Sequence, residues 1–413
     1  MTDFEERGYF SEPERMEFSS VVRKVESGPD GLSRIWLDRT FFYPESGGQP
    51  SDRGTLGGLK VVTVLEDEDG VCHHVEGALS VGETVRGEIE RERRQDHTKQ
   101  HSGQHLLSRV FLEMCGLQTV GFHLGEDVST IDLDREIGSE GMRDKVEKRV
   151  NEIIQEDIPV TSRVVSRAEY EELRENQDEG SRIRSRLPEG VGSVRIVDVK
   201  GVDVSSCCGT HCGSTGEIGL LKITGLEKVR NAARVEFICG MRALRDYSEK
   251  HALADRLARI FTTDWRETGT AVERLVEEGK KLRKEKSELA RELASHMASD
   301  MDEPDITIGE TGLFVREFDD ADPGELREMV NRMKESPGRV VLFGIKGERP
   351  GLIFACSEDV SIDMGGIMGP VATVMGAKGG GRGDFAQGGG GESSKLGEAL
   401  EKAVELIREE LQK

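Results

Sequence analysis

Long apolar runs are missing from this chain, and aromatic residues make up only 5% of its 413 residues. A membrane-spanning helix needs about 20 consecutive apolar residues, and no stretch of the sequence approaches this length, so we expect no membrane span. The N-terminal segment MTDFEERGYFSEPERMEF is acidic and holds no apolar core, which argues against a secretory signal or a basic transit peptide. We therefore expect a cytoplasmic protein.

Cysteine is scarce, and the seven cysteines are odd in number and spread through a long chain. This pattern argues against a disulfide framework, which is typical of short secreted proteins. Metal binding and plain burial remain as the two roles for these thiols.

Positive charge is also in deficit. The chain has 57 Lys and Arg against 79 Asp and Glu, a formal net charge of −22. Proteins that bind nucleic acid normally neutralise phosphates with a basic face. If this chain binds RNA, the contacts must come from local basic patches.

The length predicts two or three domains, each with its own core. In residues 1–90 the sequence alternates short β-prone runs with clusters of Gly, Pro and Asp, which predicts a small β-barrel. The runs are Phe18–Val25, Ser33–Leu37, Leu59–Leu65 and Thr84–Ile89.

Residues 91–247 mix helical and strand patterns, which predicts an α+β domain. Apolar spacing indicates helices at Thr98–Met114 and Met142–Gln155. Strand-like runs follow at Val160–Val165, Ser193–Val199 and Arg234–Cys239.

Residues 248–303 are predicted to form a helical linker or coiled coil. An imperfect heptad seam, which includes Gly279 and Lys286, consists of Val272, Leu275, Gly279, Leu282, Lys286, Leu289 and Leu293. Three interpretations stay open: an intermolecular coiled coil, a hairpin packed on its own chain, and a solvated helix between domains.

Residues 304–413 are predicted to form a separate α/β domain with a glycine-rich loop. Strand-like runs at Arg339–Ile345 and Leu352–Cys356 precede the glycines. A closing amphipathic helix has one apolar face, formed by Leu396, Leu400, Ala403, Val404, Ile407 and Leu411.

The strongest local motif is His101-Ser-Gly-Gln-His105 within the first predicted helix. Residues four apart lie on one helix face, about 6 Å apart along the axis, so both imidazoles can reach one ion. Many ordinary helices carry this spacing by chance, so the motif alone is weak evidence for a metal.

A second motif, Cys207-Cys-Gly-Thr-His211, lies between glycines and is expected in a tight loop. A thiolate and an imidazole from a loop can complete a tetrahedron begun by His101 and His105, and this mixed N/S set favours one zinc ion. Cys208 and Cys212 could exchange with these ligands, but packing is the more frequent role for such neighbours. His97 lies one turn before His101 and could orient a ligand or contact RNA.

Four ordered motifs give the chain a family resemblance. Residues 40–54 (TFFYPESGGQPSDRG), 97–107 (HTKQHSGQHLL), 207–219 (CCGTHCGSTGEIG) and 234–247 (RVEFICGMRALRDY) resemble the editing half of alanyl-tRNA synthetase. Residues 379–389 (GGGRGDFAQGG) resemble the glycine-rich signature of the DHH-associated domain, although the family usually has Arg-Pro-Asp where this chain has Arg-Gly-Asp. The whole chain resembles the long form of the AlaX trans-editing proteins.

The resemblance implies a zinc-dependent hydrolase that deacylates mischarged tRNA(Ala), chiefly Ser-tRNA(Ala), with Gly-tRNA(Ala) as a second substrate. It implies no aminoacylation activity, because the aminoacylation domain of a synthetase is not found before the editing motifs. We also expect a homodimer, formed through the helices of residues 270–298 or through the C-terminal domain.

The resemblance also assigns the substrate site. Thr40 matches the threonine that discriminates the seryl hydroxyl, and Gly48 and Gln49 belong to a turn that brings backbone and an amide close to the substrate. The alternatives without a functional role are an ordinary strand residue at Thr40 and a hairpin turn at Gly48 and Gln49. RNA contacts are expected from five basic residues, Lys378, Arg382, Arg91, Arg93 and Arg94.

Two rival interpretations remain. The first is a tRNA-binding protein with a purely structural zinc site and no catalytic activity. The second is an editing unit of the threonyl-tRNA synthetase type, which the glycine-rich signature disfavours. Four protein ligands close a zinc tetrahedron, whereas catalytic zinc usually keeps one position open, so the role of the ion is undecided at this level.

Overall fold

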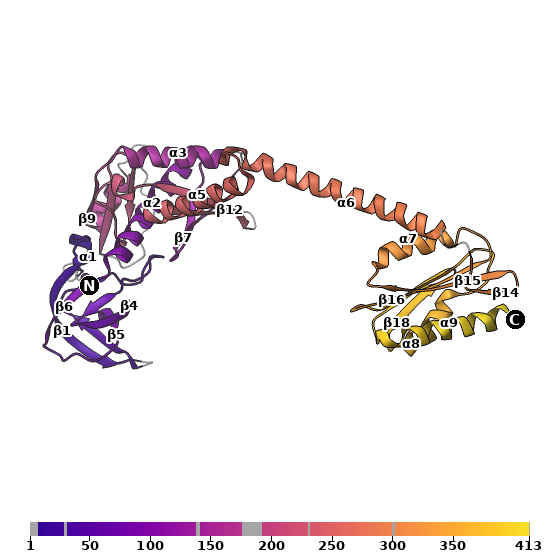
Figure 1. Cartoon of the computed structure of the whole chain (residues 1–413). Helices are drawn as coiled ribbons and strands as arrows, with labels where there is room; N and C mark the ends of the chain where they lie inside the picture. The colour runs from indigo at the N-terminus through magenta and orange to yellow at the C-terminus, as the bar shows by residue number, and fades with distance from the viewer. Residues whose placement is uncertain are drawn as a thin grey trace. The chain divides into compact units, whose positions relative to one another are not determined.

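The computed structural model describes residues 7–28, 31–137, 141–175, 192–229, 232–299, 301 and 303–412. The chain divides into two compact units, residues 1–256 and 257–413 (Figure 1). The elements that begin in the first unit are α1 (Gly8–Ser11), β1 (Glu17–Ser27), β2 (Ser33–Leu37), β3 (Gly54–Leu56), β4 (Leu59–Asp67), β5 (Gly70–Val75), β6 (Thr84–Ile89), α2 (Arg91–Cys115), β7 (Thr119–Leu124), β8 (Ser129–Leu133), α3 (Met142–Gln155), β9 (Val160–Ser166), α4 (Arg167–Glu175), β10 (Ser193–Val199), β11 (Asp203–Ser206), η3 (Thr215–Ile218), β12 (Leu221–Val229), β13 (Ala232–Cys239) and α5 (Met241–Phe261).

A closed barrel forms the start of the first unit, with strand order β1-β2-β5-β4-β3-β6. This confirms the predicted small β-barrel. Alternate residues of the strands fill its interior with apolar side chains such as Val22, Ile35 and Val61. Two of its strands were not predicted, because β3 has only three residues and β5 carries two adjacent histidines.

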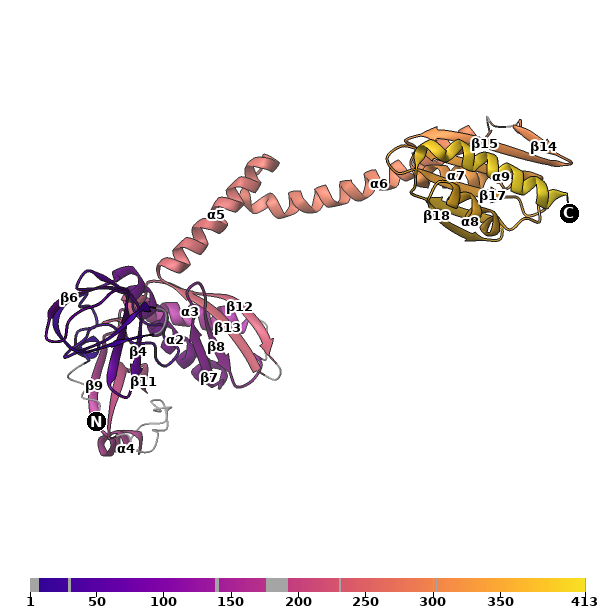
Figure 2. The same ribbon diagram turned by 90° about the horizontal axis from the view of Figure 1, so that it is seen from below.

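The rest of the first unit is the α+β layer that the sequence predicts. A four-stranded sheet of order β12-β13-β8-β7 packs against α2 and α3, as Figure 2 shows. Their shared core includes Leu107 and Phe111 of α2, Val150 of α3, and Val235 and Phe237 of β13. A second sheet, of order β11-β10-β9, carries the segment that leads into the Cys207 loop.

The second unit continues with η4 (Trp265–Glu267), α6 (Thr268–Ser299), β14 (Ile306–Ile308), β15 (Thr311–Asp319), α7 (Pro323–Met333), β16 (Arg339–Lys346), β17 (Gly351–Cys356), α8 (Met364–Val374), β18 (Lys378–Arg382), β19 (Phe385–Gly389), η5 (Ser393–Lys395) and α9 (Leu396–Leu411). Its sheet has the order β14-β15-β16-β17-β19-β18, and β15 and β16 are parallel. Helix α7 covers one face of the sheet, and α8 and α9 cover the other (Figure 1). Alternate residues of β16 point to opposite faces: Val341 and Phe343 pack against α7, while Val340 and Leu342 pack against α8 and α9. The strands β16 and β17 are buried on both faces, which explains their continuous apolar runs.

The glycine-rich segment differs from the predicted loop, because it forms the antiparallel pair β18 and β19 at the edge of this sheet. Close approach of α8 at Gly379 and of β19 at Gly381 requires glycine here. A Cβ at Gly379 would lie 2.8 Å from the side chain of Met368, and one at Gly381 would lie 2.3 Å from the backbone oxygen of Phe385.

The predicted heptad seam lies on α6. Its apolar members are strongly exposed, with Leu275 at 56%, Leu282 at 63% and Leu289 at 65%. Within the second unit α6 contacts α7. The coiled coil therefore stays a prediction that needs a second helix to cover this seam.

No helix in the described ranges combines the length and apolar character needed to cross a bilayer.

Candidate metal centre

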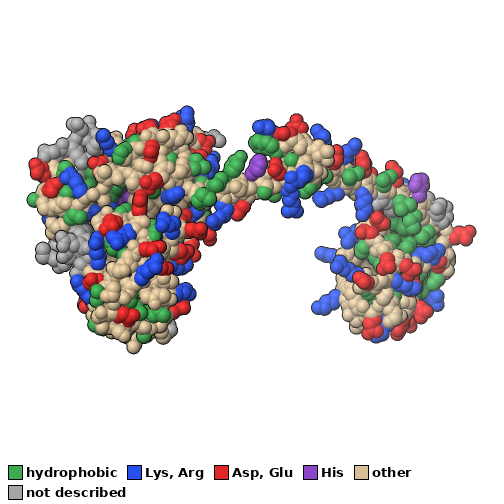
Figure 3. Space-filling model, turned by 60° about the vertical axis from the view of Figure 1, so that its left-hand side comes forward, with side chains coloured by type: hydrophobic (Ala, Val, Ile, Leu, Met, Phe, Trp, Pro, Cys, Tyr) green, Lys and Arg blue, Asp and Glu red, His purple; other side chains and the backbone are tan. Residues whose placement is uncertain are grey.

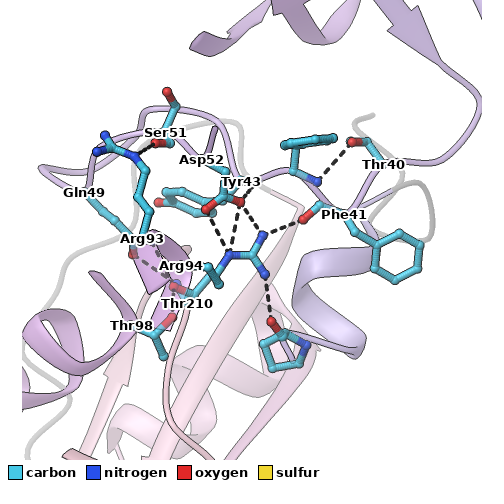
Figure 4. A network of polar contacts seen from close by, with 12 residues as sticks. Thr40, Phe41, Tyr43, Gln49, Ser51, Asp52, Arg93, Arg94, Thr98 and Thr210 are labelled. Carbon is cyan, nitrogen blue, oxygen red and sulfur yellow. Dashed lines mark hydrogen bonds and ion pairs between the residues drawn. The ribbon is translucent and has the colours of Figure 1, made fainter. Parts of the chain in front are cut away.

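A buried ion pair anchors the start of α2 to the barrel (Figure 4). The Arg94 guanidinium binds the Asp52 carboxylate with its Nε 3.0 Å from Oδ2, and it also donates to the backbone oxygens of Pro13 and Phe41. Arg94 and Asp52 are 1% and 2% exposed. This anchor fixes the helix that carries the two histidines of the HxxxH motif.

His101, His105, Cys207 and His211 lie together, as the two motifs predict. One ligand atom from each can be chosen so that all four atoms lie within 4.8 Å of one another. The Cys207 Sγ lies 3.3 Å from His101 Nε2 and 3.3 Å from His211 Nε2. Helix α2 supplies His101 and His105, and the loop supplies Cys207 and His211, so the four side chains meet at one point.

The loop can approach α2 this closely only because residue 209 is glycine. A Cβ at Gly209 would lie 2.0 Å from the His101 ring. Further hydrogen bonds hold the loop on the helix: Thr98 Oγ1 lies 2.8 Å from Thr210 Oγ1, and the Cys212 amide donates to Ser102 Oγ at 3.0 Å.

Gln49 of the barrel orients His101. Its side-chain oxygen lies 2.7 Å from His101 Nδ1 and also accepts the Thr210 amide at 3.1 Å, while its Nε2 donates to Thr210 Oγ1 at 2.9 Å. Both the oxygen and the nitrogen of the buried amide therefore have partners inside the protein. The Gln49 carbonyl holds His101 Nδ1 and so leaves His101 Nε2 directed at the cluster. The expected contact of Gln49 with the substrate stays a prediction.

Ser205 and Asp203 perform the same task for His105. Ser205 Oγ lies 2.9 Å from His105 Nδ1, and the Asp203 carboxylate lies 3.7 Å from it. Sequence reasoning missed both residues, although Asp203, Ser205 and Cys207 alternate along the end of β11 and so share one face. That alternation is the signal that could have revealed them.

The electrostatics of the cluster favour a thiolate at Cys207 and a neutral ring at His211, whereas Asp203 and Cys207 outweigh burial and raise the pKa of His105 to about 9. Burial opposes ionisation of the Cys207 thiol, but His101 and His211 hold its pKa well below the usual range. Burial lowers the pKa of His211 to about 3, so this imidazole is neutral. A thiolate and neutral imidazoles are the forms that bind metal ions.

Arg195 fixes the backbone of the loop. Its Nη1 donates to the backbone oxygens of Cys207 and Gly209, both at 2.9 Å, and its guanidinium stacks 4.9 Å from the Phe10 ring centre. Arg195 is only 3% exposed. It is a third residue that the sequence did not reveal.

The donor set and its spacing fit a zinc ion. Bond lengths of about 2.0–2.3 Å at tetrahedral geometry put ligand atoms about 3.3–3.8 Å apart, which agrees with the S···N distances above. Each of His101 and His105 also has the outer hydrogen bond that is typical of a metal-bound imidazole.

Thr40 lies in the segment between β2 and β3 that also carries Gln49. Its hydroxyl is 2.8 Å from His73 Nε2 and accepts the Phe42 amide at 3.1 Å, and the side chain is 4% exposed. In Figure 4, Thr40 and Gln49 lie on opposite sides of the Asp52–Arg94 pair.

Gly48 connects the barrel turn to the α+β layer. Its φ is +80°, and a Cβ would lie 3.0 Å from the Phe122 ring and backbone oxygen. Its own oxygen accepts the Leu124 amide at 3.0 Å. Both features require glycine and position Gln49 next to it.

The five basic residues predicted to contact RNA have different surroundings. Arg91 is exposed at the start of α2, and Lys378 and Arg382 are exposed on β18. Arg93 is mostly buried and binds Ser51 O and Glu126. Arg94 is enclosed, so its guanidinium is unavailable to a phosphate and serves the anchor instead.

Comparison with known proteins agrees with these features. Residues 194–236 match the family described as threonyl and alanyl tRNA synthetase second additional domain, and residues 310–412 match the DHHA1 domain. The mouse alanyl-tRNA editing protein Aarsd1 is 32% identical over 375 residues, which cover 88% of this chain and 86% of that protein.

The alanine–tRNA ligase of Natronomonas pharaonis is 32% identical over 421 residues. The match covers 98% of this chain but only 44% of the ligase, so the chain spans less than half of that relative. The C-Ala domain of Aquifex aeolicus alanyl-tRNA synthetase has 28% sequence identity and a TM-score of 0.23, and the match covers 26% of this chain and 97% of that domain.

The fold is thus a barrel and an α+β layer that share a candidate metal centre, followed by an α/β unit of the DHHA1 type. The chain belongs to the family of alanyl-tRNA editing proteins related to alanine–tRNA ligase.

Proposed function

We propose that this protein is an aminoacyl-tRNA hydrolase that removes wrongly attached amino acids from tRNA(Ala), chiefly serine and, as a second substrate, glycine. The observation that carries the proposal is the cluster of His101, His105, Cys207 and His211 in a chain whose relatives include alanyl-tRNA editing proteins. A pocket shaped for alanine rejects an added hydroxyl by only about a hundredfold and cannot exclude a smaller residue by size, so a second, hydrolytic site is needed.

The cluster residues would hold one zinc ion, and the ion would supply a Lewis acid for ester hydrolysis. In the reaction, the oxygen of water bonds to the ester carbonyl carbon, and the bond from that carbon to the ribose oxygen breaks. One proton of the water passes to the ribose oxygen, the other is released to solvent, and the amino acid leaves as a carboxylate. Gln49, Ser205 and Arg195 fix the imidazoles and the loop, so that little reorganisation is needed during this step.

Access to the cluster supports a catalytic role. His101 and His211 are buried, whereas His105 and Cys207 are partly exposed. A cavity of about 360 Å³, lined by Thr98, Lys99 and His211 among others, also reaches this region.

Thr40 is proposed to recognise the seryl hydroxyl. His73 Nδ1 lies 3.0 Å from the Ile35 oxygen, which only accepts, so this nitrogen carries the proton. Burial lowers the pKa of His73 to about 4, so the ring is neutral and its Nε2 accepts from the Thr40 hydroxyl. One acceptor position of Thr40 Oγ1 stays open after the Phe42 amide bond, and a seryl hydroxyl can donate to it.

The wider assignments also remain proposals. Arg91, Arg93, Lys378 and Arg382 are proposed to contact tRNA phosphates, and the exposed seam of α6 is proposed to form a homodimer interface. The proposed place of action is the cytoplasm, where mischarged tRNA is produced.

One observation favours a second function, a tRNA-binding protein with a structural zinc ion. Four protein ligands close a tetrahedron, and closed sites are usually structural. In that case loss of the ion would unfold the protein, and no ester would be cleaved at any zinc load.

A panel of tRNA(Ala) molecules charged with serine, glycine, alanine and threonine tests the proposed function. The protein loaded with zinc is expected to release serine fastest, glycine more slowly, and alanine and threonine at the background rate. Rapid release of threonine alone would indicate the threonyl type of editing unit. Stable esters in all four samples would contradict the proposal.

A further inference from the structure

A cavity of about 570 Å³ lies beside the first turns of α2, on the first unit. Its lining comes from the barrel, from α2, from the loop after β7 and from the start of α5. The residues are Arg53, Glu92, Arg93, Gln95, Asp96, His97, Lys99, Glu126, Met241, Arg242 and Arg245.

This cavity has the opposite charge balance to the chain as a whole. Five Lys or Arg side chains and three carboxylates line it, whereas the chain carries a net charge of −22. Figure 3 shows basic and acidic side chains interspersed over the face that it displays, so a local excess of cations is a distinct feature.

Two of the three carboxylates are already neutralised by arginine. Asp96 binds Arg242, whose Nε lies 2.9 Å from Oδ1 and whose Nη1 donates to the Gly125 oxygen. Glu126 pairs with Arg53 at 3.1 Å and with Arg93 at 3.0 Å. By contrast, Lys99 and Arg245 form no ion pair with any described residue of the chain, so their charges are available.

A buried, unpartnered nitrogen also lines this cavity. His97 is only 2% exposed, and its Nδ1 has no hydrogen-bond partner among the described residues. Burying a polar group without a partner is costly, and such a group in a cavity indicates a ligand atom. A neutral imidazole can present an N–H at this position to an anionic oxygen.

The cavity adjoins a second, smaller cavity that includes a residue of the candidate metal centre. Gln95 and Lys99 line both this cavity and the smaller one that includes His211. Lys99 itself lies two residues before His101 on α2. A ligand at Lys99 can therefore be part of a molecule whose other end reaches the metal ligands.

We infer that this cavity binds a backbone phosphate near the acylated end of the RNA substrate, through Lys99, Arg245 and His97. The inference rests on the proposed function and identifies where the protein binds a phosphate of that substrate. Backbone phosphate fits better than a base, because the lining offers cations and an N–H but no Phe, Tyr or Trp for stacking.

The salt dependence of tRNA binding provides the test. The full-length protein, its double variant Lys99→Gln/Arg245→Gln and the charge-retaining variant Lys99→Arg/Arg245→Lys are titrated with mischarged tRNA(Ala) at several salt concentrations. Loss of the two cations is expected to weaken binding about tenfold and to lower the slope of log K against log salt by about 1. The charge-retaining variant is expected to keep the wild-type slope.

Lys148→Gln on α3 is the matched control, because Lys148 is 79% exposed and lies outside the cavity. It is expected to leave both affinity and slope unchanged. An unchanged slope in Lys99→Gln/Arg245→Gln, in a protein that still deacylates seryl-tRNA, would overturn this inference and leave the proposed function intact. A reduced slope in a protein that never cleaves the ester would support this inference and defeat the proposed function. Absence of tRNA binding by the wild-type protein would overturn both.

Discussion

Gln49 and His101 are 52 positions apart in the chain, yet Gln49 Oε1 lies 2.7 Å from His101 Nδ1. The Thr210 amide donates to the same oxygen, which identifies it as the carbonyl of the side chain. His101 Nδ1 must then carry the proton, and the lone pair of Nε2 faces Cys207. A barrel residue thus sets the tautomer of a metal ligand on α2.

We expect Gln49→Ala to lower zinc affinity 10- to 100-fold, because His101 loses the bond that orients it. Competition with a chelator of known affinity measures this change. Gln118→Ala is the control, since Gln118 is exposed after α2 and its side chain takes no part in the cluster. Equal zinc affinity in Gln49→Ala and the wild type would refute the orienting role.

Arg94 and Arg91 form a matched pair of predictions on one helix turn. Arg94→Ala leaves Asp52 buried without its partner, so we expect about 3–5 kcal/mol less unfolding free energy. Arg91→Ala changes an exposed residue and is expected to alter stability by less than about 0.5 kcal/mol, with weaker tRNA binding instead. Urea unfolding and tRNA titration of both variants distinguish the two roles. Equal stability of the two variants would contradict the buried anchor.

Thr40→Val is expected to reduce the preference for seryl over alanyl esters by about 10- to 100-fold, because a buried hydroxyl partner is lost. The measurement is kcat/KM for Ser-tRNA(Ala) and Ala-tRNA(Ala), taken with each variant. Thr55→Val in β3 controls for a general change in the barrel. If Thr40→Val keeps the wild-type ratio, another residue recognises the hydroxyl.

His73 makes the stability of the folded protein depend on pH. Burial lowers its pKa in the folded protein to about 4, below the unfolded value of about 6.5, so the unfolded state binds more protons between these limits. The stability contribution of neutral His73 is therefore complete above pH 6.5 and is lost as the pH falls toward 4, by up to about 3 kcal/mol. His73→Gln is expected to flatten this part of the profile in urea unfolding at pH 7, 6 and 5. A variant that follows the wild-type profile would contradict the assignment.

The sequence predicted those elements that have a strong period or a clear boundary. Strand β10 begins and ends where the run Ser193–Val199 does, and the closing helix α9 buries the predicted Leu396, Leu400 and Ile407. The strands β3 and β5 were missed because they are short or polar, and their stability comes from neighbours in the closed barrel rather than from their own residues. The glycine-rich strands were read as a loop because the packing of α8, which requires glycine, is not visible in local sequence.

For the candidate site too, local patterns could be predicted from the sequence, whereas contacts between distant segments could not. Spacing of four on a helix and the Gly-bounded Cys207–His211 motif were enough to predict the metal cluster, because these are local patterns. The supporting contacts of Gln49, Ser205 and Arg195 join distant segments, so they depend on tertiary structure. Arg94 shows the opposite error, since a basic residue beside basic neighbours resembles an RNA contact until burial is known.

The time course of serine release from Ser-tRNA(Ala) tests the central claim most directly. It is measured with the zinc-loaded protein, with the protein after chelation and with the chelated protein after zinc is restored, while circular dichroism monitors the fold. The account predicts rapid release by the loaded protein, a loss of at least about a hundredfold on chelation with the fold retained, and recovery with zinc. An ester that stays intact with the folded, zinc-loaded protein would contradict the account.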